Sequence, residues 1–273
     1  MSAAKARRWG AFYFAEHQLR AMRAYLLTIV VTSVGNPFLY LFSMGVGLAS
    51  IVDRTAAGGG AGGQGAAFDG VGYLAYAAPA LLVSSAVMTC AMEMMFPVMD
   101  GFKWRRVYYG PHVTPLVPGQ LAVGHIMAVG VRLTVQCLVF FLVMLAFGAA
   151  PSPSAWLLVP LGVGAAMAFG APLMAYAARL EKEAFQFSMI QRFIVMPLFL
   201  FSGTFYPLET MPAALQWIGW ISPLWHGNQL GRAVSYGLAE EPWLVAAHVG
   251  YLALLGAVGI AWARRNYTRR MAA

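Results

Sequence analysis

Two charged residues, one acidic and one basic, lie inside long apolar stretches. There an acidic side chain can bind and release a proton, and a basic side chain can serve as its counter-charge. Glu93 belongs to the apolar run 73–96, and Arg132 belongs to the run 120–147. A charge at membrane depth costs about 3 kcal/mol on insertion scales, so such a residue is by default a functional or paired site. At the helical rise, Glu93 is roughly 6 Å from the end of its run and Arg132 is roughly 18 Å inside its own. The two side chains can therefore pair only if the first helix continues past Pro97 or the second begins late.

The same residues motivate one hypothesis of function, a proton-coupled secondary transporter in which Glu93 takes up the proton and Arg132 is its counter-charge. Such transporters are commonly built from repeated sets of spans, and the sequence shows no such repeat. Two other roles are equally open for Glu93, a side chain that reaches the interface or one that contacts the next loop. For Arg132, the lining of a polar cavity or of a subunit seam is favoured over structural pairing. A non-transporting membrane scaffold is a third hypothesis.

A second group of chemically informative residues forms the segment 97–119, which separates the two apolar runs. Its sequence PVMDGFKWRRVYYG interleaves cations with aromatic residues. This composition suits a short amphipathic helix at the membrane surface or at a contact with a partner protein. The residues of interest are Asp100, Phe102, Lys103, Trp104, Arg105, Arg106 and Tyr108.

Composition indicates that membrane-spanning helices carry these residues. Of all residues, 60% are hydrophobic and 10% are charged, and the mean hydropathy is +0.66, whereas soluble domains carry roughly 25% charged residues. The apolar residues form runs of about 20, the length of a helix across a bilayer, and do not alternate as barrel strands do. We predict an all-α membrane protein with a single domain, residues 1–273. The net charge of +8 then reflects membrane topology and does not indicate a nucleic-acid partner.

Six membrane spans are predicted, together with three segments of other kinds. Residues 1–24 mix cations with an aromatic face that includes Trp9 and Phe12, which predicts an amphipathic helix at the membrane surface. The glycine-rich stretch 53–72 predicts a loop. Proline and tryptophan divide the region 206–242 into short pieces, which predicts a re-entrant helical element before the last span. The six spans are Leu26–Ile51, Tyr73–Phe96, Gln120–Phe147, Ala155–Ala178, Phe187–Phe205 and Trp243–Ala263.

The distribution of charge predicts the orientation of these spans. Six spans place both termini on one side, which would carry the five N-terminal cations, the basic residues of 97–119 and the four C-terminal arginines. By the positive-inside rule, this side is the cytoplasm.

No motif for enzyme chemistry is present. The sequence lacks HExxH, GxSxG, paired aspartates at prenyltransferase spacing and a Walker lysine in a GxxxxGK context. We therefore predict that the chain is not an enzyme and carries no cofactor of its own. The energy for any transport must come from an ion gradient or from another subunit.

The stretch 198–234 contains a characteristic order of motifs. It reads LFLFSGTFYPLETMPAALQWIGWISPLWHGNQLGRAV, with Ser-Gly-x-Phe-Tyr-Pro, Met-Pro, an apolar helix, Pro-Leu-x-His and an arginine. This order resembles the ABC-2-type transport permease family, in particular the branch of NodJ-like and daunorubicin-type exporters. Thr114-Pro115-Leu116 resembles the family's Thr-Pro element, although the usual preceding Gly-Thr-x-Glu is replaced by KWRRVYYG. The matching residues of the stretch are Ser202, Gly203, Phe205, Tyr206, Pro207, Met211, Pro212, Pro223, Leu224, His226 and Arg232.

The resemblance implies a half-transporter in a bacterial cytoplasmic membrane. The chain would act as a homodimer, in contact with membrane lipid, beside two ATP-binding-cassette ATPase subunits that bind ATP and Mg. The segment 97–119 would be the coupling helix that docks on the ATPase through the seven residues of interest, and 206–242 would be an outer gate or a simple seal. The cargo would be amphipathic or hydrophobic, such as a lipid-linked saccharide, a lipid or a drug. The residues assigned to the pathway or gate are Glu93, Arg132, Phe205, Tyr206, Pro207, Pro212 and Trp217.

Overall fold

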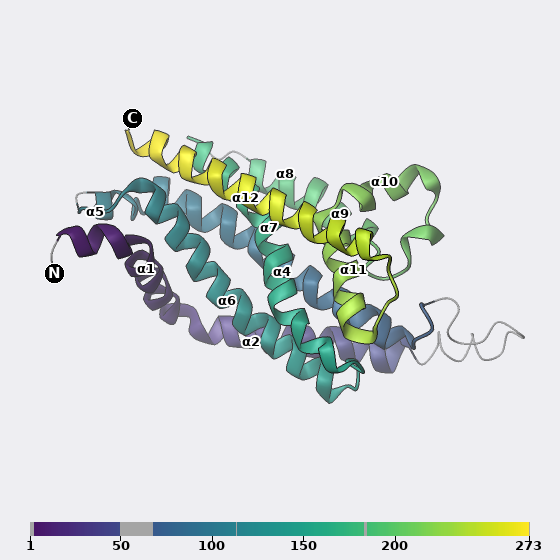
Figure 1. The fold of residues 1–273 in the computed structure, drawn as a ribbon. Helices are drawn as coiled ribbons and strands as arrows, with labels where there is room; N and C mark the ends of the chain where they lie inside the picture. Colours follow the sequence, from purple (N-terminus) through teal and green to yellow (C-terminus); the bar gives the residue numbers. More distant parts are fainter. Residues whose placement is uncertain (1–2, 50–67, 113, 183–184, 273) are drawn as a thin grey trace, which may run out of the picture.

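The computed structural model describes residues 3–49, 68–112, 114–182 and 185–272. All of the regular structure in these residues is helical, as the composition predicts. Most of the predicted loop 53–72 lies outside the described residues. Both ends of the described chain and the short helix α5 (Tyr109–His112) lie at one end of the molecule (Figure 1), whereas α10 (Ala213–Ile221) and α11 (Pro223–Tyr236) lie at the other.

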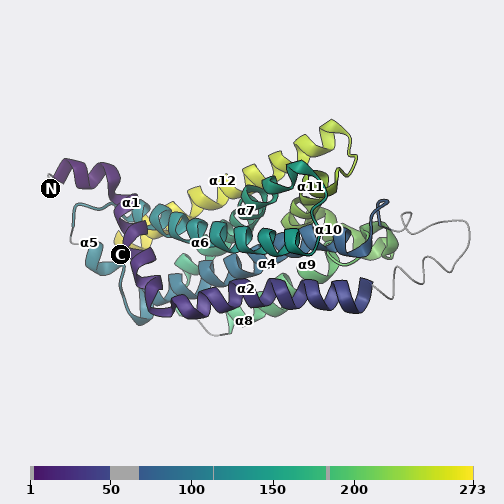
Figure 2. The ribbon, with the colours of Figure 1, turned by 90° about the horizontal axis from the view of Figure 1, so that it is seen from below.

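Five helical segments are long and apolar enough to cross a membrane. Helix α4 (Tyr73–Met99) ends in a π-helical turn, Asp100–Trp104, and α7 (Leu158–Arg179) begins with a 3-10 turn, Pro153–Leu157. Figure 2 shows α2 and α12 on opposite sides of the bundle, with α4 and α6 between them. The five segments are Arg8–Gly45, which contains most of α1 and all of α2, Tyr73–Trp104, Pro118–Ala146, which is α6, Pro153–Arg179, and Pro242–Ala272, which is α12.

The predicted fifth span, Phe187–Phe205, is shorter in the structure. Helix α8 (Gln186–Ile190), a π-helical turn and α9 (Met196–Phe201) form one apolar run, Gln186–Phe201, that falls short of the length of a candidate span. At 1.5 Å per residue such a run covers roughly 24 Å, less than the roughly 30 Å of hydrocarbon. The helix ends because Gly203 has a φ of +67°, which a continuing α-helix cannot accommodate. The prediction of six full spans is therefore confirmed for five of them only.

The N-terminal helix packs on α6. Helix α1 (Ala3–Met22), a 3-10 turn and α2 (Leu26–Phe42) follow one another as nearly continuous helix. The ring of Phe14 is buried, and α1 contacts α6. Trp9 and Phe12 are exposed on another face of α1. A separate helix that lies flat on the membrane is not confirmed, and the interfacial position of these two aromatic residues stays a prediction.

Helix α4 is the centre of the packing. Most of its side chains are buried, and it packs against α6, α7 and α11. Helix α7 also packs against α12, and small residues permit both close approaches. A Cβ at Gly170 would collide with the Cys90 Sγ of α4, and a Cβ at Gly259 of α12 would lie 2.5 Å from the Pro172 Cδ of α7.

Helix α2 has the opposite character, with apolar side chains exposed along its length. A contiguous apolar surface of this kind is unfavourable in water, so lipid or a partner must cover it. Together with the five candidate spans, this surface shows a membrane protein. The exposed side chains include Leu27, Val31, Val34, Phe38 and Leu39.

Candidate functional site

The connection from α4 to α6 begins where the last turn of α4 widens, just after Pro97. Residues Asp100–Trp104 are π-helical, and the Asp100 carbonyl accepts hydrogen bonds from the Arg105 and Arg106 amides, with N···O distances of 3.0 and 3.3 Å. Arg106 then has a φ of +54°, in the left-handed region where a helix commonly ends. The chain therefore turns back sharply toward its own helix.

This turn brings Tyr108 back against α4. The Tyr108 amide donates to the Gly101 carbonyl (3.2 Å), and the ring lies so close that any Cβ on Gly101 would collide with it. The ring packs edge-on to Phe102, with 4.8 Å between centroids, and its hydroxyl accepts a hydrogen bond from the Tyr267 hydroxyl of α12 (3.2 Å). Burial raises the pKa of the Tyr108 hydroxyl well above its usual value. An aromatic cluster thus joins the connection to the C-terminal helix.

This cluster corrects the prediction that Phe102 and Tyr108 dock on a partner protein. Their side chains are 2% and 0% exposed, because they fill the space between α4, α12 and the N-terminal helix. Side chains buried within their own subunit have no surface left to bury against another. Trp104, by contrast, is 51% exposed. The predicted docking surface is thereby reduced to the exposed residues 103–106.

Asp100 orients one of these exposed cations. Its carboxylate accepts a hydrogen bond from the Arg105 Nε (2.6 Å) and forms an ion pair with the Nη2. This contact raises the pKa of Arg105 above its ordinary value. An exposed ion pair of this type adds little stability, so its effect is to fix the position of the Arg105 guanidinium.

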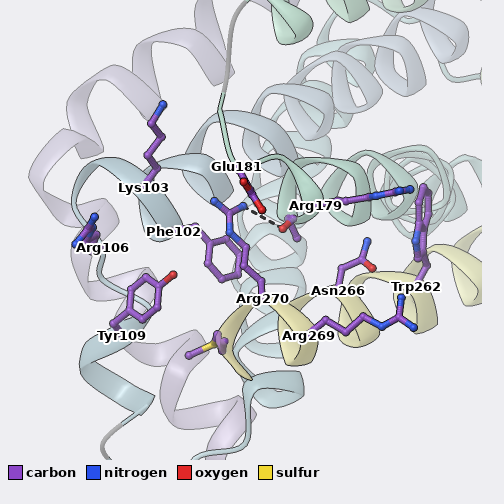
Figure 3. A pocket seen from close by; sticks show the side chains of 12 residues that line it. Phe102, Lys103, Arg106, Tyr109, Arg179, Glu181, Trp262, Asn266, Arg269 and Arg270 are labelled. Atoms are coloured by element: carbon purple, nitrogen blue, oxygen red, sulfur yellow. Dashed lines mark hydrogen bonds between the residues drawn. The ribbon is translucent and has the colours of Figure 1, made fainter. Parts of the chain in front are cut away.

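A cavity of about 890 Å³ opens at the same end of the molecule. Its walls come from the α4–α6 connection, the end of α7 and the last turns of α12 (Figure 3). Among the described residues that line it, Glu181 is acidic and five are basic. The five cations are Lys103, Arg106, Arg179, Arg269 and Arg270.

Arg270 links this cavity to the end of α7. Its guanidinium lies 4.4 Å from the centroid of the Phe102 ring and donates to the carbonyl of Ala178 (3.0 Å), with a longer contact to Ala177 (3.4 Å). Carbonyls at a helix C-terminus lack partners within the helix and carry partial negative charge, so a cation is favourable there. The cation is thus fixed in place between two helices.

Glu93 and Arg132 form an ion pair between the Oε1 and the Nη1. Helix α4 continues past Pro97 to Met99, which brings the carboxylate to the level of Arg132 on α6. The two side chains are 15% and 16% exposed, and the His125 Nε2 lies 3.0 Å from the Glu93 carbonyl oxygen. The pair therefore bridges two helices of the bundle, so the stated condition for pairing is met. The favoured role of Arg132, in the lining of a polar cavity or subunit seam, stays a prediction.

A second polar cluster, at the opposite end, holds the segment 202–204 against α4 and α11. The Asn228 amide donates to the Ser202 carbonyl (3.0 Å) and to the Thr204 hydroxyl (3.2 Å). The Ser84 hydroxyl of α4 lies 3.3 Å from that same hydroxyl. All four side chains are buried, so these bonds satisfy groups that water cannot reach.

Arg232 belongs to the same cluster. Its guanidinium lies 3.9 Å from the centroid of the Tyr76 ring, donates to the Gly203 carbonyl and donates to the Gln229 side chain (3.0 Å). The sequence marked Arg232 only as part of a motif, and its ring partner on α4 could not be found from spacing. Arg232 is 2% exposed, so it is an internal residue and not a surface cation.

Five of the residues predicted to line the pathway or gate follow the segment 202–204 along the chain. Phe205 packs edge-on against a phenylalanine of α9, with 5.1 Å between centroids. Pro207 is partly buried, whereas Tyr206, Pro212 and Trp217 are exposed. Exposed aromatic residues at one end of a bundle suit a membrane interface. Their role in gating stays a prediction.

A pair of histidines at this end, His226 and His248, should make the stability of the protein depend on pH. The Nδ1 atoms of His226 and His248 lie 2.6 Å apart, so only one of them can carry a proton. Burial, and then the neighbouring His248, lower the pKa of His226 to about 4. The pKa of a histidine in an unfolded chain is about 6.5. Between pH 4 and pH 6.5, roughly, the unfolded chain therefore binds more protons than the folded chain. We expect the free energy of unfolding to fall as the pH decreases from about 6.5 to about 4.

Denaturant unfolding of the full chain in detergent, at about pH 7 and about pH 5, measures this decrease. The His226→Gln variant should lose the share of the pH dependence that His226 contributes, so its free energy of unfolding should change less between the two pH values than that of the wild type. A variant with the full dependence of the wild type would show that other groups cause it.

Comparison with known proteins is consistent with this arrangement. A model of the family described as ABC-2 type transporter matches residues 11–236. Nodulation protein J of Rhizobium leguminosarum bv. viciae is 23% identical over 228 residues, which cover 84% of this chain and 82% of the relative. Nodulation protein J of Rhizobium meliloti (strain 1021) is 22% identical over 233 residues, covering 85% and 82%. Nodulation protein J of Neorhizobium galegae is 23% identical over 241 residues, covering 87% and 86%.

Proposed function

Because the chain belongs to the ABC-2 type transporter family, we propose that it is the transmembrane permease subunit of an ATP-binding-cassette exporter. The observation that carries this proposal is the family match from residue 11 to residue 236, most of the chain. The helical fold and its five candidate spans agree with such a subunit. The ATP and Mg would bind to a separate ATPase subunit, and this chain would be the membrane path.

The exposed residues 103–106 are the surface on which we place the ATPase contact. Trp104 offers an exposed aromatic anchor, and Arg105 is oriented by Asp100. Tryptophan and arginine are the residue types that most often dominate the energy of an interface. This surface is continuous with α4 and is joined to α12 through the buried Tyr108, so a movement of the docked ATPase would pass to both helices.

The remaining parts of the assembly follow from the same proposal. The chain would function as a homodimer with two ATPase subunits in a bacterial cytoplasmic membrane, with both termini in the cytoplasm. The apolar face of α2 would contact lipid or the second copy. The cargo would be amphipathic or hydrophobic, and the region 206–242 would gate or seal its exit.

Changing Trp104 and Arg105 to alanine together is expected to reduce association with the co-expressed ATPase subunit by at least about 30-fold, since an anchor of this type contributes about 2 kcal/mol or more. Co-purification in lipid and ATP hydrolysis by the complex measure the loss. The matched control is Trp217→Ala at the opposite end, where the tryptophan is 55% exposed. This control should leave association unchanged. Equal association of both variants would place the ATPase contact elsewhere.

A further inference from the structure

The basic cavity at the end of α7 and α12 has a large excess of positive charge. Five basic side chains and one carboxylate, Glu181, line it among the described residues, which leaves four positive charges in excess. Near a protein surface, two like charges 8 Å apart repel each other by roughly 2 kcal/mol. An anion in the cavity would relieve this repulsion and gain contacts with several cations at once.

The side chains of the cavity suit phosphate in particular. Three of the cations that line the cavity are arginines from two helices, Arg179 of α7 and Arg269 and Arg270 of α12. The planar guanidinium group matches phosphate oxygens in a bidentate manner. A volume of about 890 Å³ is far larger than a single ion requires and lies within the usual range for pockets that hold an organic ligand.

The position of the cavity indicates where the ligand comes from. Figure 3 shows Trp262 on one side of it and Lys103 and Arg106 on the other, with Arg270 between them. Trp262 is partly exposed on α12 and comes shortly before the C-terminal arginines, where the apolar stretch of this helix ends. Tryptophan at the end of an apolar stretch favours the depth of the lipid headgroups. The cavity therefore extends from headgroup depth into the more polar end of the molecule.

We propose that this cavity binds the phosphate headgroup of an anionic membrane lipid, with Arg179, Arg269 and Arg270 as the phosphate ligands. Basic pockets between membrane helices on the cytoplasmic side are a known setting for such headgroups. The excess charge favours a lipid with two phosphates over a lipid with one. This inference goes beyond the proposed function and does not require an ATPase partner.

The lipid site and the proposed docking surface, residues 103–106, overlap at Lys103 and Arg106 but not at the two docking residues chosen for the ATPase test. Trp104 and Arg105 are absent from the described lining of the cavity, whereas Lys103 and Arg106 contribute to its edge. Variants on α7 and α12 can therefore test the lipid site without changing the two residues on which the ATPase test depends.

Native mass spectrometry of the full chain in detergent tests the proposal. Cardiolipin, phosphatidylglycerol and phosphatidylcholine with matched acyl chains would be added separately, and inorganic phosphate would be added as a competitor. We expect occupancy to decrease in that order of lipids, with at least a tenfold difference between the first and the last. Equal binding of phosphatidylcholine would overturn the proposal. Complete displacement by about 1 mM inorganic phosphate would assign the site to a soluble anion and would overturn the lipid as its source.

The decisive variants compare cations inside and outside the cavity. The double variant Arg179→Gln/Arg269→Gln is expected to weaken cardiolipin binding by about 100-fold, because a hydrogen bond to a charged group is worth roughly tenfold or more in affinity. The control Arg264→Gln/Arg265→Gln removes the same charge from exposed positions of α12 outside the cavity and should change binding less than twofold. Equal losses in the two variants would show a general effect of charge and reject the site.

Two further measurements keep this result interpretable. If the double variant fails to fold, Arg269→Gln alone and Arg265→Gln alone provide the same comparison on one helix. Association with the ATPase should be retained in the cavity variants. Loss of lipid binding with retained association separates this site from the docking surface.

Discussion

Replacing Arg132 by glutamine is expected to destabilise the protein by about 3 kcal/mol, because it leaves the Glu93 carboxylate unpaired inside the bundle. The carboxylate is 15% exposed in the ion pair, so water cannot fully take the place of the guanidinium. Glu93→Gln should have a similar cost. The double variant Glu93→Gln/Arg132→Gln should recover much of it, since two neutral amides are far less costly to bury than one charge. Unfolding in mixed micelles measures all three variants, and the difference between the single and double variants gives the coupling of the pair.

A matched control is Arg192→Gln on the helix 186–201, where the side chain is exposed. Its expected effect is within about 0.5 kcal/mol. An equal cost at Arg192 and Arg132 would show that the ion pair does not stabilise the fold.

The double variant Glu93→Gln/Arg132→Gln also distinguishes the two transport mechanisms. An ATP-driven exporter that uses the pair structurally should retain transport, whereas a proton-coupled transporter that relies on Glu93 should lose it.

Replacing Gly259 by valine is expected to separate α12 from α7 and to destabilise the protein by about 3 kcal/mol or more. A Cβ at this position would lie 2.5 Å from the Pro172 Cδ, 2.7 Å from the Pro172 nitrogen and 2.9 Å from the Ala171 carbonyl carbon. Two of these three atoms belong to the backbone of α7, so no change of side-chain rotamer can make room. The free energy of unfolding in detergent measures the effect. The cavity at the end of both helices should also lose its lipid affinity.

The control for this substitution lies on the same helix. A Cβ added at Gly250 would have no atom within 4 Å, so Gly250→Val adds the same side chain to α12 in open space. Its expected effect is within about 1 kcal/mol, the size of an intrinsic preference. If Gly259→Val is no more harmful than Gly250→Val, the close approach of α7 and α12 is not required for stability.

The pairing of Glu93 with Arg132 illustrates the limit of local reasoning. From the sequence, the two side chains can pair if the helix of Glu93 continues past Pro97. The sequence alone does not determine whether the helix does so. Proline removes one backbone hydrogen bond and usually bends or ends a helix. In the folded chain, α4 is packed on several sides and continues to Met99. Tertiary packing therefore overrides the local preference.

The α4–α6 connection shows the same limit in another form. Its composition correctly indicated an exposed basic and aromatic surface at Trp104 and Arg105. It could not indicate that Phe102 and Tyr108 are internal, because their burial depends on Tyr267, which is 159 residues away from Tyr108 along the chain. By composition alone, aromatic residues in a loop are equally compatible with an exposed interface and with a buried core. Only the position of α12 distinguishes the two.

Local features of the chain are enough to establish that this protein is helical, lies in a membrane and belongs to the ABC-2 type transporter family. These properties depend on hydropathy, on helical periodicity and on the order of short motifs. Other features emerge only in the folded molecule. They are the shortened apolar run Gln186–Phe201, the ion pair between α4 and α6, the contact between two histidines and the basic cavity. Each of them depends on how closely distant helices approach, and that approach is set by the packing of many side chains together.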